Sequence, residues 1–170
     1  PNRIAARWNN LGRVYQAGGG LEKAIECFQQ AAELWKDSGT SEHHANRALA
    51  LKNLALVYQT QGKLPEARQT LLDAIICSEE IYGADHPDIG RDASLLGQVL
   101  QELGEYPAAL EQFQRALAID QKSFGAVHPE VALAYNSLGV LHFLMGSILQ
   151  AQQALETARD ILTRCAPSDH

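Results

Sequence analysis

Apolar and polar residues alternate along the chain at intervals of three and four, which is the spacing of amphipathic helices. Residues 8–31 show this pattern most clearly, in two runs separated by the glycines at 18–20. The apolar faces of the two runs contain Trp8, Leu11, Tyr15, Ala24, Phe28 and Ala31. Gly12 adjoins the first face as a notch, so a second helix can approach closely. We therefore predict two antiparallel helices joined by a glycine turn.

The same pattern returns three more times along the chain. The matching positions hold Leu51, Leu54, Ala55, Tyr58, Ala67, Leu71 and Ala74, then Ala93, Leu96, Gly97, Leu100, Ala109, Phe113 and Ala116, and last Tyr135, Leu138, Gly139, His142, Ala151, Leu155 and Ala158. The turn glycines Gly19, Gly62, Gly104 and Gly146 follow one another at intervals of 43, 42 and 42 residues. We expect four helix pairs, at about residues 4–37, 45–82, 87–124 and 129–164.

This arrangement resembles the tetratricopeptide repeat, whose signature places Trp, Leu-Gly, Tyr, Ala, Phe and Ala at these spacings. The resemblance implies an all-α fold, an α-solenoid of about four antiparallel helix pairs in which residues 1–170 form a single domain. Successive pairs would stack into a right-handed superhelix with their first helices along a concave groove. A groove of this kind takes a peptide segment or a partner helix.

The two later connections between pairs share one plan, Gly-x-x-His-Pro-acid-aliphatic, at residues 83–89 and 125–131. Each glycine can end a helix and each proline can begin the next, while His86 and His128 fit the extended cap position before it. A catalytic role for these histidines is less favoured, because one recurs at each of the two connections. Together with the 42-residue spacing, this plan is similar to the kinesin light chain subclass of the repeat.

The first connection, residues 38–44, departs from that plan and is predicted to be a polar loop before a helix that begins near Ala45. His43 and His44 stand there in place of His-Pro. We interpret both as loop residues and not as metal ligands, because no further ligand accompanies them.

Composition narrows the classes of function. The chain of 170 residues is 46% hydrophobic with a net charge of −6, which argues against general affinity for nucleic acid or an anionic membrane. The three cysteines form no Cys-x-x-Cys pair, so neither a disulfide framework nor a metal site is indicated, and a reducing, cytoplasmic location fits best. No apolar run is long enough to span a membrane. Because no cofactor motif and no nucleophile with its base are evident, we expect no enzyme and no cofactor. The chain starts at Pro1, so we expect a fragment of a longer protein.

The helix register also predicts which side chains face the groove. These are Asn9, Asn10, Arg13, Lys52, Asn53, Gln59, Arg91, Ser94, Gln98, Asn136, Val140 and Phe143. Asparagine is a poor residue for a helix interior, but its amide both donates to and accepts from a peptide backbone, so we favour peptide binding over simple solvation of this strip. Arg13, Lys52 and Arg91 add positive charge, which favours an acidic peptide; a chance distribution of surface charge is the alternative.

The resemblance itself implies two ligand classes. Kinesin light chain repeats bind peptides in which acidic residues flank a tryptophan, and chaperone-binding members of the superfamily clamp a C-terminal carboxylate. Asn53 and Arg91 match two positions of that clamp. Asn9, Arg13 and Leu95 stand where lysine, asparagine and a cation are expected, so a complete clamp is not predicted.

The fourth helix pair is apolar where the others are polar. Its predicted groove stripe and the turn after it contain Val140, Phe143, Leu144, Met145, Ile148 and Leu149. A homo-oligomer or structural scaffold formed through this pair is therefore the alternative function.

Three residues near the ends of second helices complete the predictions. Leu34 and Cys77 occupy one repeat position and are expected in the core. Trp35 either anchors a partner or packs over the first connection.

Overall fold

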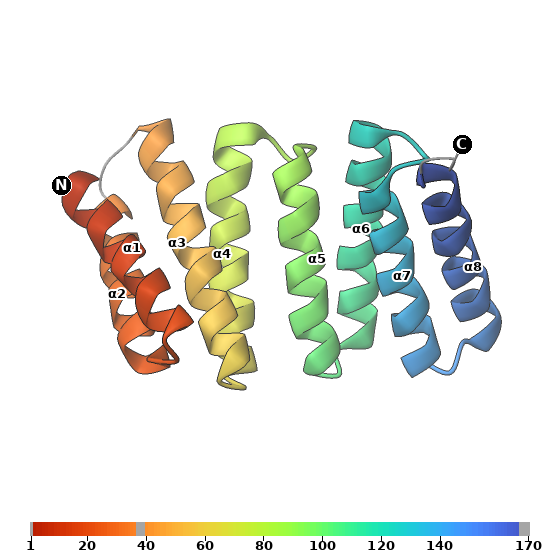
Figure 1. The fold of residues 1–170 in the computed structure, drawn as a ribbon, viewed down its shortest axis with the longest axis horizontal. Coiled ribbons are helices and arrows are strands. Elements are labelled where there is room, and N and C mark those ends of the chain that lie inside the picture. Colours follow the sequence, from red (N-terminus) through yellow and green to blue (C-terminus); the bar gives the residue numbers. More distant parts are fainter. Residues whose placement is uncertain (1, 37–39, 167–170) are drawn as a thin grey trace. The chain divides into compact units, whose positions relative to one another are not determined.

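The computed structural model describes residues 2–36 and 40–166. Over these residues the chain is all-α and has eight helices and no strand, which confirms the predicted fold class. The helices are α1 (Asn2–Ala17), α2 (Leu21–Lys36), α3 (Ser41–Thr60), α4 (Leu64–Tyr82), α5 (Pro87–Glu102), α6 (Tyr106–Phe124), α7 (Pro129–Leu144) and α8 (Ile148–Cys165) (Figure 1). They form two compact units, α1 to α4 up to Ala84 and α5 to α8 from Asp85 onward.

Two stacked helix pairs make up the first unit. α1 packs on α2, α3 packs on α4, α2 packs on α3, and α1 also contacts α3 directly. One core cluster contains Ala24, Ile25, Phe28, Leu54 and Val57. A second cluster contains both Trp35 and Cys77. The core position of Cys77 is thus confirmed, and Trp35 packs inside the unit and does not form a surface anchor.

The second unit repeats this plan with α5 on α6, α7 on α8, and α6 on α7. Val131 and Ala132 of α7 form a core cluster with Ile161 of α8. Leu117 of α6 packs against the same cluster, which joins the two pairs.

Small residues in the first helices let the second helices approach closely, as the register predicted. A Cβ atom added to Gly12 would lie 2.7 Å from Cε1 of Phe28, and one added to Gly97 would lie 2.7 Å from Cε1 of Phe113. A Cβ atom on Gly139 would lie 2.6 Å from Cγ of Leu155. These distances are too short for any real side chain, so the notch is a packing requirement.

The connections that contain His-Pro form the helix caps expected of them. Nδ1 of His86 accepts a hydrogen bond from the backbone N–H of Asp88 at 3.2 Å, and Nδ1 of His128 accepts one from Glu130 at 3.2 Å. Gly83 ends the preceding helix at a φ of 80°, a conformation that favours glycine. The cap interpretation of both histidines is confirmed.

The first connection differs from its prediction. α3 begins at Ser41 and not near Ala45, because Oγ1 of Thr40 caps the helix by accepting from the N–H of His43 at 3.4 Å. His43 and His44 are therefore helical and not loop residues. Nδ1 of His44 lies 3.2 Å from Oε2 of Glu80 on α4. Residues 38 and 39 of the predicted loop lie outside the described residues.

Four predicted core residues, Trp8, Leu11, Leu34 and Leu155, are exposed instead. Trp8 and Leu11 are 36% and 40% exposed, although Leu54, which matches Leu11 in the second pair, is 5% exposed. Leu54 is covered because it packs on Ala24 and Phe28 of the preceding pair, and no earlier pair among the described residues covers α1. Leu34 is also exposed, so the prediction that it points inward is wrong.

Candidate functional site

Four of the predicted groove residues line a single hollow in the second unit. Arg91, Ser94 and Gln98 of α5 face Asn136 of α7 across a volume of about 440 Å³. The remaining lining residues are Leu95, Asp120, Glu130, Leu133, Ala134 and Ser137. The α5 residues share one face because they lie three and four positions apart. We call this space the α5–α7 hollow.

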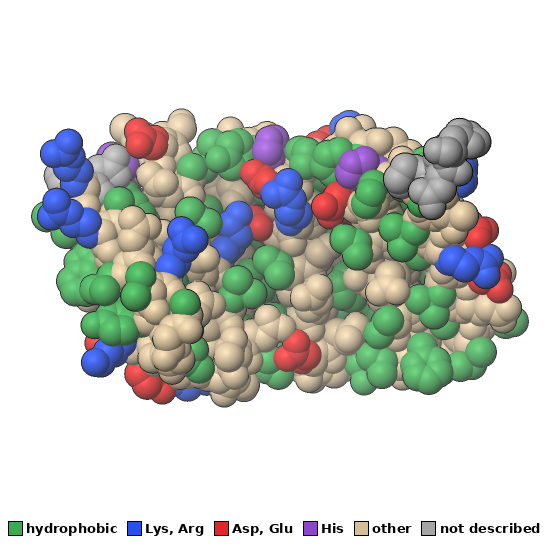
Figure 2. Space-filling model, in the orientation of Figure 1, with side chains coloured by type: hydrophobic (Ala, Val, Ile, Leu, Met, Phe, Trp, Pro, Cys, Tyr) green, Lys and Arg blue, Asp and Glu red, His purple; other side chains and the backbone are tan. Residues whose placement is uncertain are grey.

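The α5–α7 hollow is lined by more negative than positive charge. Nη1 of Arg91 lies 3.0 Å from Oδ1 of Asp88, so this guanidinium already has a partner. Asp120 reaches the hollow from α6, with only 6% of its surface exposed. Burial raises the pKa of the Asp120 carboxyl, and Glu130 raises it further, while Arg91 and His128 act in the opposite direction. In Figure 2, acidic side chains lie near a basic one over the upper half of α5.

The first unit presents its predicted residues differently. Nδ2 of Asn53 donates a hydrogen bond to Oδ1 of Asn9 at 3.2 Å and so links α3 to α1. Asn9 is only 7% exposed, so its prediction as an exposed groove residue is wrong. The direct contact between α1 and α3 buries it. The side-chain oxygen of Asn9 therefore serves as the hydrogen-bond acceptor for Asn53 across the contact between α1 and α3.

The other predicted residues of the first unit remain accessible. Asn10 and Arg13 are exposed on α1, and Lys52 and Gln59 are half-buried on α3. The two residues that matched the carboxylate clamp both have partners within the chain, since Asn53 donates to Asn9 and Arg91 pairs with Asp88.

The apolar residues of the fourth pair are exposed, as the register predicted. Phe143 is 63% exposed and Val140 is 39% exposed. Around them, the exposed residues Leu144, Met145, Ile148 and Leu149 form what we call the α7–α8 apolar surface. Figure 2 shows apolar side chains gathered over the lower end of α7.

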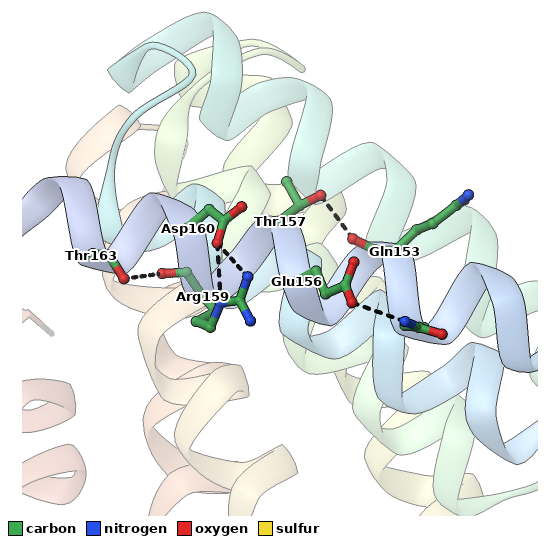
Figure 3. A network of polar contacts seen from close by, with 7 residues as sticks. Gln153, Glu156, Thr157, Arg159, Asp160 and Thr163 are labelled. Atoms are coloured by element: carbon green, nitrogen blue, oxygen red, sulfur yellow. Dashed lines mark hydrogen bonds and ion pairs between the residues drawn. The ribbon is translucent and has the colours of Figure 1, made fainter.

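The polar face of α8 contrasts with that surface. Nε2 of Gln152 donates to Oε1 of Glu156 at 2.9 Å, and Nη2 of Arg159 lies 2.8 Å from Oδ1 of Asp160 (Figure 3). The hydroxyl of Thr157 donates to the carbonyl oxygen of Gln153. All these contacts are local to α8, which is typical of a solvated helix face.

Sequence reasoning missed Asp120 and Glu130. Asp120 occupies the repeat position that holds Trp35, Ser78 and Leu162 in the other pairs. The presence of a carboxylate at a position where the other pairs have no charged residue was the sequence feature that could have identified it. Gly90 stands opposite, where the other pairs have Ala5, Ala48 and Ala132. A Cβ atom on Gly90 would lie 2.9 Å from Oδ1 of Asp120, so the glycine makes room for the carboxylate.

The described residues contain no group of three or more His, Cys, Asp or Glu side chains that could hold a metal ion. Burial raises the pKa of the Cys27 and Cys77 thiols, which keeps them protonated and poorly nucleophilic at neutral pH. In the same part of the chain, no helix combines the length and apolar character needed to cross a membrane.

Several known structures are similar to this chain. BtubC (BKLC) from P. vanneervenii is 20% identical, with a TM-score of 0.85 over 98% of this chain and 67% of that one. A putative kinesin light chain with nearly identical TPR-like repeats from Podosopora anserina is 26% identical, with a TM-score of 0.83 over 96% of this chain and 77% of that one. The apo form of RapI is 17% identical, with a TM-score of 0.84 over 98% of this chain and 44% of that one.

No curated protein matches the chain in sequence. A family model described as Tetratricopeptide repeat matches residues 3–75, 46–122 and 91–164. Because these overlapping matches extend along nearly all of the sequence, the chain belongs to the tetratricopeptide repeat family, and its repeats are similar to those of kinesin light chains.

Proposed function

We propose that this chain is a non-catalytic interaction module that binds a peptide or protein segment along the first helices of its repeats. The observation that supports this most strongly is the α5–α7 hollow, in which side chains from two successive repeats converge. Tetratricopeptide repeats generally mediate protein–protein interaction, which agrees with the proposal. A cytoplasmic location is part of the same proposal.

The lining of the hollow suits an extended peptide. Gln98 and Asn136 can each donate to and accept from a peptide backbone. Leu95 and Leu133 supply apolar surface against which a ligand side chain can be desolvated. Hydrogen bonds to the peptide backbone and a few side-chain contacts are sufficient to bind a peptide, and they require no catalytic group.

The expectation of an acidic ligand applies to the first unit only. There Arg13 and Lys52 give the first helices positive charge. In the second unit, Arg91 is paired with Asp88, and Asp120 and Glu130 line the hollow beside it.

Blocking the hollow tests the proposal. A phage-displayed library of random peptides is selected against the chain, and the selected peptides are titrated by fluorescence polarisation. Asn136→Trp places bulk on the exposed rim of the hollow and should weaken binding by about tenfold or more, ~1.4 kcal/mol. Gln114→Trp makes the same change on an exposed α6 residue outside the lining and should leave binding unchanged.

Equal binding by Asn136→Trp and the wild type would contradict the proposal. A selection that yields no peptide above background would also contradict it.

Self-association through the α7–α8 apolar surface is the second candidate. A contiguous exposed apolar surface is typical of an interface. Light scattering should show a dimer for the chain and a monomer for Phe143→Glu, while Leu162→Glu, the same type of change on α8, should remain dimeric. A monomeric wild type at high concentration would rule the candidate out.

A further inference from the structure

Asp120 is a buried carboxylate that faces a solvent-accessible space. It lies near the end of α6, is only 6% exposed, and lines the α5–α7 hollow. Among the described residues, no hydrogen bond or ion pair of this carboxylate is found, and its charge interactions with Glu130, Arg91 and His128 are longer-range. A buried charge without a partner is normally destabilising, so its presence calls for a ligand or for compensation.

The surrounding residues supply no direct hydrogen-bond or ion-pair partner for the carboxylate among the described residues. Arg91 is the basic residue in the lining, and its guanidinium is held 3.0 Å from Asp88. Nδ1 of His128 accepts the N–H of Glu130 and caps α7. Glu130 itself lines the hollow and adds a second negative charge.

Gly90 shows that the position of the carboxylate is built into the packing. The other three repeats have a buried alanine where Gly90 stands, at Ala5, Ala48 and Ala132. Without a Cβ atom at Gly90, Oδ1 of Asp120 can lie against α5. The third repeat therefore differs from the others at both positions, and together the two differences place a carboxylate in the hollow.

We propose that the α5–α7 hollow binds the cationic side chain of a peptide, a lysine or an arginine, with Asp120 as its counter-ion and Glu130 beside it. The inference rests on the proposed peptide-binding function and names the chemistry of one anchor. A long basic side chain fits this lining, because its apolar stem can pack on Leu95 and Leu133 while its charged end meets Asp120. Charge-assisted hydrogen bonds of this kind are the strong ones.

Matched peptides test the charge requirement. The probes are acetyl-Gly-Leu-Xaa-Leu-Gly-amide, with Xaa as lysine, arginine or Nε-acetyl-lysine, titrated into the 15N-labelled chain up to about 5 mM, a range suited to one charged anchor. The lysine or arginine peptide should shift the backbone amides of α5 and α7 and bind at least tenfold more tightly than the acetyl-lysine peptide. The tighter of the two basic peptides identifies the preferred cation.

Two variants assign the effect to Asp120. Asp120→Asn keeps the shape and removes the charge, and Asp120→Ser uses the residue found at the same repeat position, Ser78, which is fully buried. Both should reduce the preference for the basic peptide to within about twofold. Asp160→Ser removes an exposed carboxylate of the same unit and should bind as the wild type does. Circular dichroism melts confirm that each variant folds.

Three results would overturn the inference: no shift with either basic peptide, equal binding of the acetyl-lysine peptide, or full preference retained by Asp120→Asn. If library-selected peptides are still blocked by Asn136→Trp, peptide binding stands and only the cationic anchor fails. If Asn136→Trp has no effect on them, the proposed function itself fails.

Discussion

The first helices of the two units carry the same repeat signature and form different surfaces. In the first unit, α1 contacts α3, and the Asn53–Asn9 hydrogen bond closes the contact. In the second unit, a hollow of about 440 Å³ is lined by both α5 and α7. The signature residues build the helix pairs, and residues outside the signature determine whether the surface between them is closed or hollowed.

The difference extends to the second helices. The repeat position that holds Ser78 in α4 holds Asp120 in α6. Ser78 is fully buried, whereas Asp120 lines a hollow and lies against a glycine. A carboxylate should therefore be tolerated in the second unit and not in the first.

Moving the carboxylate into the first unit should have the largest effect. Ser78→Asp buries a charge where Ala48 takes the place of Gly90, and we expect a loss of about 3 kcal/mol in the free energy of unfolding. Urea denaturation followed by circular dichroism measures it. Adding Ala48→Gly should restore part of the loss, because it recreates the glycine found opposite Asp120.

The Ala48→Gly variant alone is the control for the double variant. If Ser78→Asp is as stable as the wild type, the hollow is not what allows a carboxylate at this position.

Removing the carboxylate from the second unit should have a smaller, pH-dependent effect. The pKa of Asp120 is higher in the folded chain than in the unfolded chain. At a pH between these two pKa values, the folded chain holds a proton that the unfolded chain has lost. The stability of the wild type therefore falls as the pH rises through the interval between the two pKa values. The Asp120→Ser variant has no carboxyl to ionise at this position, so its stability does not decrease in this way. It should be more stable than the wild type at pH 7, by about 1 to 2 kcal/mol in the free energy of unfolding.

The gain should shrink as the pH falls toward about 4, the ordinary pKa of an aspartate. Urea denaturation at a series of pH values gives the comparison. A gain that does not vary with pH would place the effect in packing and not in the charge.

Breaking the asparagine link should have the smallest effect. Asn9→Ala removes the acceptor of the Asn53 hydrogen bond, so the first unit should lose about 0.5 to 1.5 kcal/mol. Asn10→Ala changes the neighbouring exposed residue and should lose less than about 0.5 kcal/mol. Thermal unfolding of the two variants distinguishes a structural link from a solvated strip, and equal stability would mean that the link contributes nothing.

Periodicity was sufficient to predict much of the fold. The spacing of Gly12, Gly97 and Gly139 from their partner residues identified the helix contacts correctly, because close packing of two helices needs a small residue at a fixed register. The start of α3 was missed, since Thr40 caps it with a local hydrogen bond that the His-Pro plan of the later connections did not suggest. Trp8 and Leu11 were misplaced because their burial depends on a neighbouring pair and not on their own helix.

The candidate site was predicted only in part. Arg91, Ser94, Gln98 and Asn136 were found because one face of a helix follows directly from residue spacing. Asp120 was not found, since a residue on a second helix reaches the hollow only through the way α5, α6 and α7 pack together.

By itself, the sequence determined the helix pairs, their turns and the packing faces, because these depend on interactions between residues that are near one another in the chain. Tertiary structure alone decided that Asn9 is buried by a contact with α3, and that Asp120 is left without a partner in a hollow beside Gly90. The physical reason is that burial and pairing depend on side chains brought together from separate helices. The repeat pattern does not predict which of those side chains contact a given residue.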